Sequence, residues 1–447
     1  MRTAALGNVA TPLAAMLSMP ILAYGLGVDG RGQVAAATAP LLLAATAATF
    51  GIPEAITYLV ARSPSLAGAA VRRGAVLIGL SGLLATAICI SASGLLTVDQ
   101  PDIGRLMIVA SVVLVPTLLV LVLRACAAGL HCWRLVALEQ GVGAVVRLVA
   151  LAVLAVVGTL TPITATIVMV AAPVAGGLAY LPLSRRRERH TGEDIAGDSA
   201  TTSRLLGYGA RIWIGALSGV VLSRLDQVIM TPLSSSYQLG LYAVAVSISD
   251  VTLILHSAMR DVIFATDASA RDNERLCAST RISGLLSICL GTFLAVLVPF
   301  GIPVFFGQDF SPAIPSAFWL LAAVVLATPG SIAGAGLSAR GRPGLRSLAL
   351  AFAAVVNILA LVVLVPLLGA VGAAIATLVG NLVASQINII SIVRVSGIRM
   401  REFYGIRRVD VAVIGQCVSS LGIPSRRTKT SNAVSTKDVG LSIEGRL

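Results

Sequence analysis

Long apolar stretches dominate this sequence and restrict the folds that it can adopt. Each stretch has about 20 residues or slightly more, which is the length that a helix needs to cross the hydrocarbon core of a bilayer. The stretches are too long, and too continuously apolar, for the alternating strands of an outer-membrane barrel. They predict twelve spans, at 4–26, 34–60, 74–97, 105–125, 137–158, 162–183, 206–230, 237–260, 281–300, 316–338, 345–366 and 370–393.

The composition supports a polytopic all-α membrane protein. Of the 447 residues, 57% are hydrophobic and only 12% are charged, about half the charged fraction of a soluble domain. The net charge of +13 is explained by arginines on the inner side of the membrane, and no nucleic-acid partner is expected. The six cysteines lack zinc-ligand spacing, and neither an ATP-binding nor a dinucleotide-binding motif is found. No metal site and no cofactor is therefore predicted.

The loop arginines predict the orientation. With both termini in the cytoplasm, nearly all loop arginines face the cytoplasm, whereas the opposite loops contain only Arg31 and Arg105. Two connections, 159–162 and 367–369, are so short that the helices flanking each of them must be antiparallel neighbours. The predicted domains are an N-terminal six-helix lobe (1–183), a basic cytoplasmic inter-lobe loop (184–205), a C-terminal six-helix lobe (206–393) and a basic, disordered cytoplasmic tail (394–447).

The two predicted lobes resemble each other. Gly32 and Gly240 occupy matching places after the first helix of each lobe, at an offset of 208 (240 − 32). Because six helices return the chain to the side where it began, such a repeat is parallel. The lobes are then related by an axis along the membrane normal.

Ionisable residues inside the predicted spans are the candidate functional groups, because a charge in the bilayer is costly without a partner or a cavity. They are Glu54, Arg147, Arg211, Arg224, Asp226, Asp250 and His256. A structural buried ion pair is the alternative for Arg224 and Asp226, which are two residues apart and cannot pair with each other along one helix. Arg211 can line a cavity or extend to the inner surface. Glu54 follows Pro53, which predicts a kink in the second helix.

Three segments carry a family resemblance: PILAYGLGVDGRGQVAAATAP (20–40), GIPEAITYLVAR (51–62) and SRLDQVIMTPLSSSYQLGLYAVAVSISD (223–250). Across about residues 1–395 the sequence resembles the Wzx-type oligosaccharide-lipid flippases of the MOP (MATE-like) superfamily. The resemblance implies two six-helix bundles that form a V around a central cavity. It also implies alternating-access transport of a polyprenyl-diphosphate-linked oligosaccharide across the cytoplasmic membrane.

The resemblance also suggests roles for the charged residues. Arg147, Arg224 and Arg211 are the candidates for binding the diphosphate headgroup, and Asp226, Asp250 and Glu54 are the candidates for coupling to a proton or sodium gradient. The expected partners are the lipid-linked oligosaccharide, membrane lipids, a polysaccharide polymerase and glycosyltransferases.

The sequence is compatible with other functions as well. A MATE-like cation-coupled drug antiporter is the nearest alternative, and acidic residues should then dominate the cavity. A membrane glycosyltransferase or ligase would need a large extracytoplasmic loop, which the sequence lacks. A structural subunit of a polysaccharide-synthesis complex is a further alternative. Lipid II flippases have arginines in the first helix, and Ala4–Leu26 has none, which favours another polysaccharide precursor.

Overall fold

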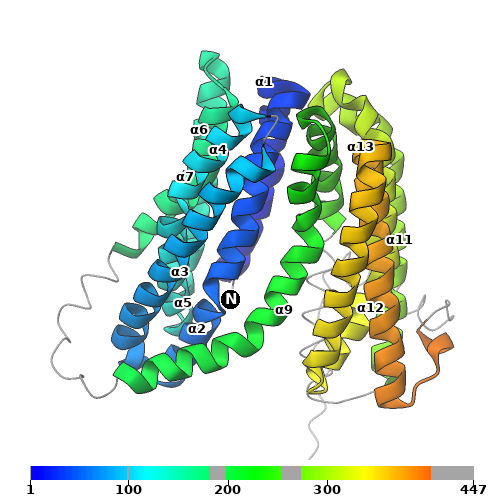
Figure 1. The fold of residues 1–447 in the computed structure, drawn as a ribbon. Helices are drawn as coiled ribbons and strands as arrows, with labels where there is room; N and C mark the ends of the chain where they lie inside the picture. The colour runs from blue at the N-terminus through cyan, green and yellow to red at the C-terminus, as the bar shows by residue number, and fades with distance from the viewer. Residues whose placement is uncertain (1, 98–99, 182–197, 253–272, 404–447) are drawn as a thin grey trace, which may run out of the picture. The chain divides into compact units, whose positions relative to one another are not determined.

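In the computed structural model, every described element is a helix (Figure 1). The described residues are 2–97, 100–181, 198–252 and 273–403, without the side chains of 2–13, 198–201, 211, 212, 214–216 and 275. They all belong to one unit, Met1–Gly405. The predicted basic loop over 184–197 and the tail from 404 onward lie outside the described residues.

The first half of the chain contributes seven of the described α-helices. They are α1 (Arg2–Thr49), α2 (Ile52–Arg62), α3 (Ala67–Leu96), α4 (Pro101–Val112), α5 (Leu114–Gly129), α6 (Trp133–Val157) and α7 (Pro162–Gly177). The second half contributes α9 (Asp198–Leu233), a helix over 236–252, α11 (Asn273–Phe306), α12 (Ile314–Ala339) and α13 (Pro343–Ser396). Short 3-10 helices are η1 (Pro64–Leu66), η2 (Leu178–Tyr180), η4 (Gln308–Ala313) and η5 (Met400–Glu402).

Within the described residues, 8 helices are long and apolar enough to cross a membrane. Two of them are broken by a glycine in the left-handed region, α1 at Gly27 (φ 66°) and α13 at Gly369 (φ 56°). Glycine adopts this conformation without the steric cost that a side chain brings. The predicted all-helical, multi-pass membrane fold is confirmed.

The helices on either side of residues 159–162 are antiparallel neighbours, as predicted. Gly158 ends α6 in the left-handed conformation, and a capping box at Thr161 begins α7. A Cβ added to Gly143 would lie 3.2 Å from the carbonyl oxygen of Ala172, and one added to Gly176 would lie 2.5 Å from that of Glu139. Later residues of α6 therefore contact earlier residues of α7, so the two helices are antiparallel.

The break at Gly369 likewise folds α13 back on itself. A Cβ on Gly372 would lie 2.1 Å from the carbonyl oxygen of Leu364, and one on Gly380 would lie 2.8 Å from Cβ of Asn357. A straight helix would separate residues 357 and 380 by about 34 Å. The two parts of α13 therefore form the predicted antiparallel pair.

The predicted kink at Pro53 is in the wrong place. The second predicted span breaks at Phe50 and Gly51, both with positive φ (46° and 67°), and not at Pro53. Pro53 occupies the first turn of α2, where its missing N–H costs no helical hydrogen bond. In addition, α9 begins at Asp198, inside the loop predicted to end at residue 205.

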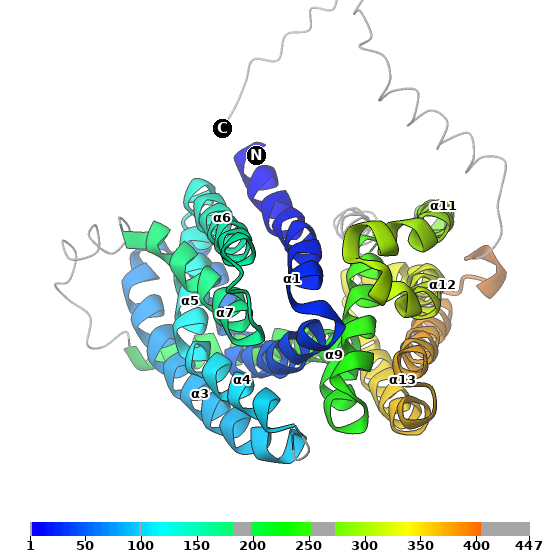
Figure 2. The ribbon, with the colours of Figure 1, turned by 90° about the horizontal axis from the view of Figure 1, so that it is seen from above.

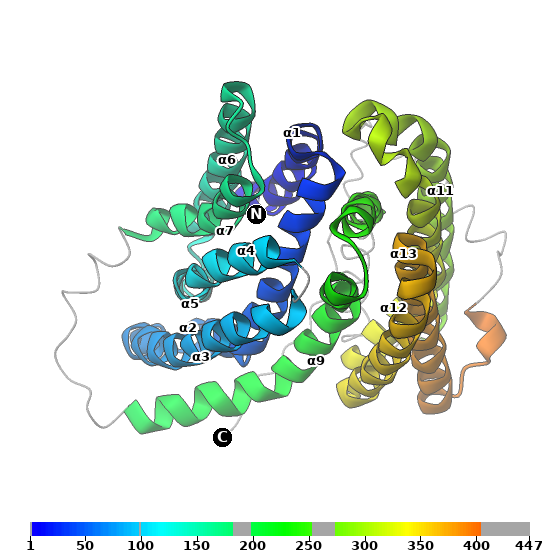
Figure 3. The same cartoon turned by 45° about the horizontal axis from the view of Figure 1, so that its top comes forward.

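Helix α9 connects the two halves of the chain. It contacts α1, α2 and α3 from the first half and α13 from the second. Figure 3 shows its first part passing along α2 and α3, and Figure 2 shows α1 and α9 between the remaining helices of the two halves. The largest buried apolar cluster joins residues of α1, α4, the 236–252 helix and α11–α13.

The two glycines of the predicted repeat meet in the structure. A Cβ on Gly32 would lie 1.8 Å from the carbonyl oxygen of Ser236, and one on Gly240 would lie 2.0 Å from that of Val28. The contacts are reciprocal, because each glycine meets the residue four positions before the other. Their backbones can touch only because neither residue has a side chain.

A second close approach holds the first part of α9 against the break between α1 and α2. A Cβ on Gly51 would lie 2.3 Å from the carbonyl oxygen of Gly209. Nearby, Trp213 donates its indole N–H to the carbonyl of Ala47 (3.0 Å) and stacks on Phe50, with ring centroids 4.9 Å apart. One glycine contact therefore holds the α1–α2 break against α9, and the contact of Gly32 with Gly240 holds α1 against the 236–252 helix.

Candidate functional site

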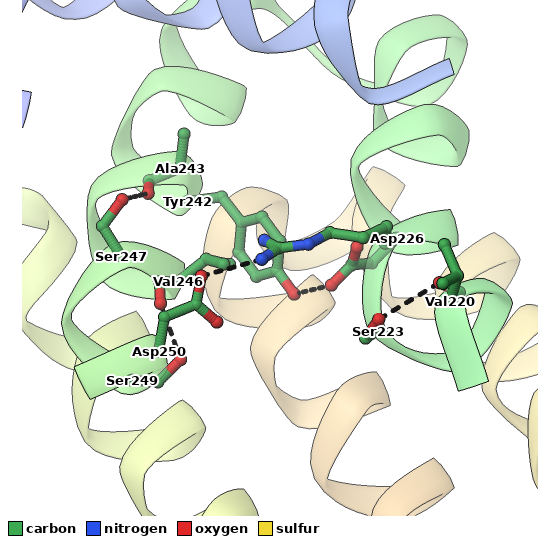
Figure 4. A network of polar contacts seen from close by, with 10 residues as sticks. Val220, Ser223, Asp226, Tyr242, Ala243, Val246, Ser247, Ser249 and Asp250 are labelled. Carbon is green, nitrogen blue, oxygen red and sulfur yellow. Dashed lines mark hydrogen bonds and ion pairs between the residues drawn. The ribbon is translucent and has the colours of Figure 1, made fainter. Parts of the chain in front are cut away.

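An ion pair links α9 to the 236–252 helix. The guanidinium Nη2 of Arg224 donates to Oδ2 of Asp250 at 2.8 Å (Figure 4). The two side chains retain 28% and 32% of their exposure. The pair is thus only partly buried, so breaking it costs less than breaking a fully buried ion pair.

A buried polar group lies beside this ion pair. Asp226, 3% exposed, accepts a short hydrogen bond from the hydroxyl of Tyr242 and a second from the backbone N–H of Gln227 at 2.7 Å. The hydroxyl of Thr377 on α13 lies 3.1 Å from that of Tyr242 and 3.5 Å from Oδ2 of Asp226. Three helices thus meet at one carboxylate.

Helical geometry explains why the two clusters are separate but adjacent. Arg224 and Asp226 are two residues apart on α9, about 200° around the helix, so each contacts a different partner. Tyr242 and Asp250 are eight residues apart on the neighbouring helix, which leaves them only about 80° apart. One face of the 236–252 helix therefore presents both partners to α9 (Figure 4).

The structure brings together three of the predicted residues: Arg224, Asp226 and Asp250. Arg147 lies elsewhere, on α6, at a small cavity beside Arg124 and Glu139. Glu54 is exposed in the first turn of α2, where a carboxylate favours the positive end of the helix dipole. The side chain of Arg211 and the whole of His256 lie outside the described residues.

Sequence reasoning missed three polar residues. Tyr242 and Thr377 are uncharged, and among many Ser and Thr residues in the spans only their position beside Asp226 distinguishes them. Glu139 is buried and pairs with Arg124, although it lies only two residues inside the predicted span 137–158. So close to the end of a span, Glu139 resembles a residue at the membrane surface. The signal that could have identified it is that it is a charged residue within an apolar stretch.

Among the described residues, no group of three or more His, Cys, Asp or Glu side chains is placed to hold a metal ion. The carboxylates of the site instead contact an arginine, a tyrosine and a threonine. Hydroxyl and carboxylate oxygens can also contact a small cation or a proton.

Substituting Tyr242 with phenylalanine should destabilise the protein. The change removes the hydroxyl that Asp226 accepts from and leaves the buried carboxylate with fewer donors, which costs about 1–3 kcal/mol. A lower midpoint of thermal unfolding in detergent checks this expectation. Tyr237→Phe is the control, because Tyr237 is exposed and its substitution should leave the midpoint unchanged. Equal midpoints for the two variants would mean that the hydrogen bond from Tyr242 to Asp226 does not contribute measurably to stability.

The sequence matches one protein-family profile, and the fold is similar to solved transporter structures. Residues 3–264 match the profile of the family described as polysaccharide biosynthesis protein, whereas no curated protein matches the sequence. The structure is similar to the lipid II flippase MurJ in an inward closed conformation, with a TM-score of 0.70, 12% identity and coverage of 96% of this chain and 94% of that chain.

Two further solved structures have a similar fold. An inward-facing multidrug resistance MATE transporter of the MOP superfamily gives a TM-score of 0.68 at 16% identity, covering 90% of this chain and 96% of that chain. A MOP superfamily transporter from Pyrococcus furiosus gives 0.56 at 15% identity, covering 88% of this chain and 94% of that chain. These likenesses establish a MATE/MurJ-like fold.

Proposed function

Because the chain belongs to the polysaccharide biosynthesis protein family and has the fold of MOP-superfamily transporters, we propose that it flips a polyprenyl-diphosphate-linked oligosaccharide across the cytoplasmic membrane. The observation that carries the proposal beyond the family is the Arg224–Asp250 pair. It places an exchangeable cation within an apolar helical protein. Family and fold both favour a transporter over a glycosyltransferase or ligase.

The proposal includes twelve spans in two six-helix lobes, 1–183 and 206–393, with both termini in the cytoplasm. The eight candidate spans support this count, because α1 and α13 are each divided by a glycine. Adding α9 and the 236–252 helix brings the number of crossings to twelve. The reciprocal contact of Gly32 and Gly240 supports the repeat between the lobes.

The headgroup step follows from the chemistry of Arg224. Guanidinium groups bind phosphate through two parallel hydrogen bonds, so a diphosphate can take the place of the Asp250 carboxylate. The displaced Asp250 then needs a proton or a small cation to neutralise its charge. Substrate binding and gradient coupling are thereby linked through one ion pair, while the polyprenyl chain stays in lipid. Polymerase and glycosyltransferases remain the proposed protein partners.

The other charged residues extend this proposal. Asp226 is the second coupling candidate, since its carboxylate joins three helices through Tyr242 and Thr377. Arg147 and Arg211 remain proposed headgroup ligands at other points along the path. Glu54 is exposed in this structure. It remains a coupling candidate for a different conformation, in which another helix packs against it.

A reconstituted transport assay tests the proposed function against drug antiport. Proteoliposomes containing the full chain should transfer an undecaprenyl-diphosphate-linked fluorescent oligosaccharide between leaflets, measured by quenching with a membrane-impermeant reagent. Ethidium, a cationic drug, should not be transported under a proton or sodium gradient. Ethidium transport without transfer of the lipid-linked sugar would instead establish the MATE-like alternative.

A further inference from the structure

A second charged cluster lies in the first half of the chain, away from the Arg224 site. Arg124 on α5 donates from Nε and Nη2 to the two carboxylate oxygens of Glu139 on α6, at 2.9 and 2.7 Å. The hydroxyl of Tyr180 donates to the same carboxylate at 3.3 Å. Glu139 is 2% exposed, whereas the Arg124 side chain is 33% exposed.

This bonding pattern orients the guanidinium of Arg124. The carboxylate engages the Nε and Nη2 edge, and because the group is planar and rigid, its Nη1 edge points away from Glu139. A bidentate bond to a buried carboxylate also fixes the arginine without the entropy loss that a free side chain would suffer on binding. Arg124 is therefore a preorganised cation.

Close helix packing positions Glu139. A Cβ on Gly176 of α7 would lie 2.5 Å from the Glu139 carbonyl oxygen, and one on Gly143 would lie 3.2 Å from the carbonyl oxygen of Ala172. The absence of side chains at these two glycines brings the backbones of α6 and α7 together. The carboxylate is thus held between α5, α6 and η2 by the packing of whole helices.

A small cavity of about 80 Å³ adjoins this cluster, and its wall includes Arg124, Glu139 and Arg147. Arg147 lies eight residues (147 − 139) beyond Glu139 on α6, about 12 Å along the helix axis. Two arginines and one carboxylate leave the wall with a net positive charge. The volume accommodates several water molecules or one phosphate group.

We propose that this cavity binds a phosphate group of a lipid headgroup, an inference that rests on the lipid-diphosphate transport proposed above. Arg147 and the Nη1 edge of Arg124 are the ligands, and Glu139 is a positioning residue. Arg124 lies five residues before the end of α5 at Gly129, and Glu139 lies six residues after the start of α6 at Trp133. Arg147 lies nearer the middle of α6, so the cavity wall extends from the helix ends towards the middle of the helix.

A binding measurement on the full chain tests the site. The protein is placed in phosphatidylcholine nanodiscs and titrated with radiolabelled undecaprenyl diphosphate. In an Arg224→Gln background, which removes the other proposed phosphate ligand, Arg147→Gln and the charge-balanced double variant Arg124→Gln/Glu139→Gln should each weaken binding at least about tenfold, the loss expected for one charge-assisted hydrogen bond. Arg134→Gln should change binding less than about twofold, because Arg134 is exposed on the same helix and does not line the cavity.

The outcomes separate the site from the function. Binding as tight as in the Arg224→Gln background in either cavity variant, with an unchanged elution profile, overturns the proposed pair of ligands. Competition by phosphatidylglycerol assigns the site to membrane phospholipid, whereas displacement by undecaprenyl diphosphate alone assigns it to the transported lipid. If the wild-type protein binds phosphatidylglycerol through these arginines but does not bind undecaprenyl diphosphate, the site stands and the proposed function fails. Binding of neither lipid overturns both.

Discussion

Replacing Arg224 with glutamine should reduce transfer of the lipid-linked oligosaccharide by about tenfold to a hundredfold. That range is the loss of one charge-assisted hydrogen bond to phosphate, about 1.5–3 kcal/mol. Glutamine keeps a polar amide but removes the charge, and Asp250, which is 32% exposed, is not left fully buried without a partner. The initial rate of leaflet transfer in proteoliposomes measures the effect.

The matched control is Arg105→Gln. Arg105 forms an exposed 3.7 Å pair with Asp102, with side-chain exposures of 81% and 78%, and such pairs contribute little to stability. Its loss should leave transfer unchanged. Normal transfer by Arg224→Gln, in protein that is correctly folded and inserted, would remove Arg224 from the headgroup path.

Replacing Gly32 or Gly240 with alanine should destabilise the protein and disturb the contact between its halves. The added Cβ would lie 1.8 Å from the Ser236 carbonyl oxygen or 2.0 Å from that of Val28. Backbone atoms cannot move aside as a flexible side chain can, so α1 and the 236–252 helix must separate. Overpacking of this kind costs about 1–3 kcal/mol or more, and a lower midpoint of thermal unfolding measures it.

Other helical glycines provide the controls for this experiment. Gly79 on α3 and Gly284 on α11 have no atom within 4 Å of an added Cβ. Alanine at either position should leave the midpoint unchanged or raise it, because alanine has the higher helix propensity. If all four alanine variants unfold at one temperature, the glycine crossing does not hold the halves together.

The apolar stretches and the glycines contain most of the information about the fold. The lengths of the stretches predict membrane-spanning helices, and the offset between Gly32 and Gly240 predicts related positions that the structure places in contact. The breaks are harder to predict. Pro53 is a strong helix-breaking signal, but the chain breaks at Phe50 and Gly51, where Gly51 approaches Gly209, a residue far away in sequence.

The candidate site is predictable only in part. The cost of a charge in the bilayer identifies Arg224, Asp226 and Asp250, and helical spacing shows that Arg224 and Asp226 need separate partners. Spacing along one helix does not identify a partner on another, so the pairing of Arg224 with Asp250 depends on how the helices pack. Tyr242 has no charge to distinguish it, although its hydroxyl satisfies the buried Asp226.

The central claim is that a lipid diphosphate displaces Asp250 from Arg224, and the affinity of Asp250→Asn for undecaprenyl diphosphate tests it most directly. Asparagine keeps the shape of the side chain but removes the competing negative charge. In nanodiscs, Asp250→Asn should therefore bind the lipid more tightly than wild type, whereas Arg224→Gln should bind it more weakly. Weaker binding by both variants would mean that the ion pair only supports the structure, and would contradict the exchange mechanism.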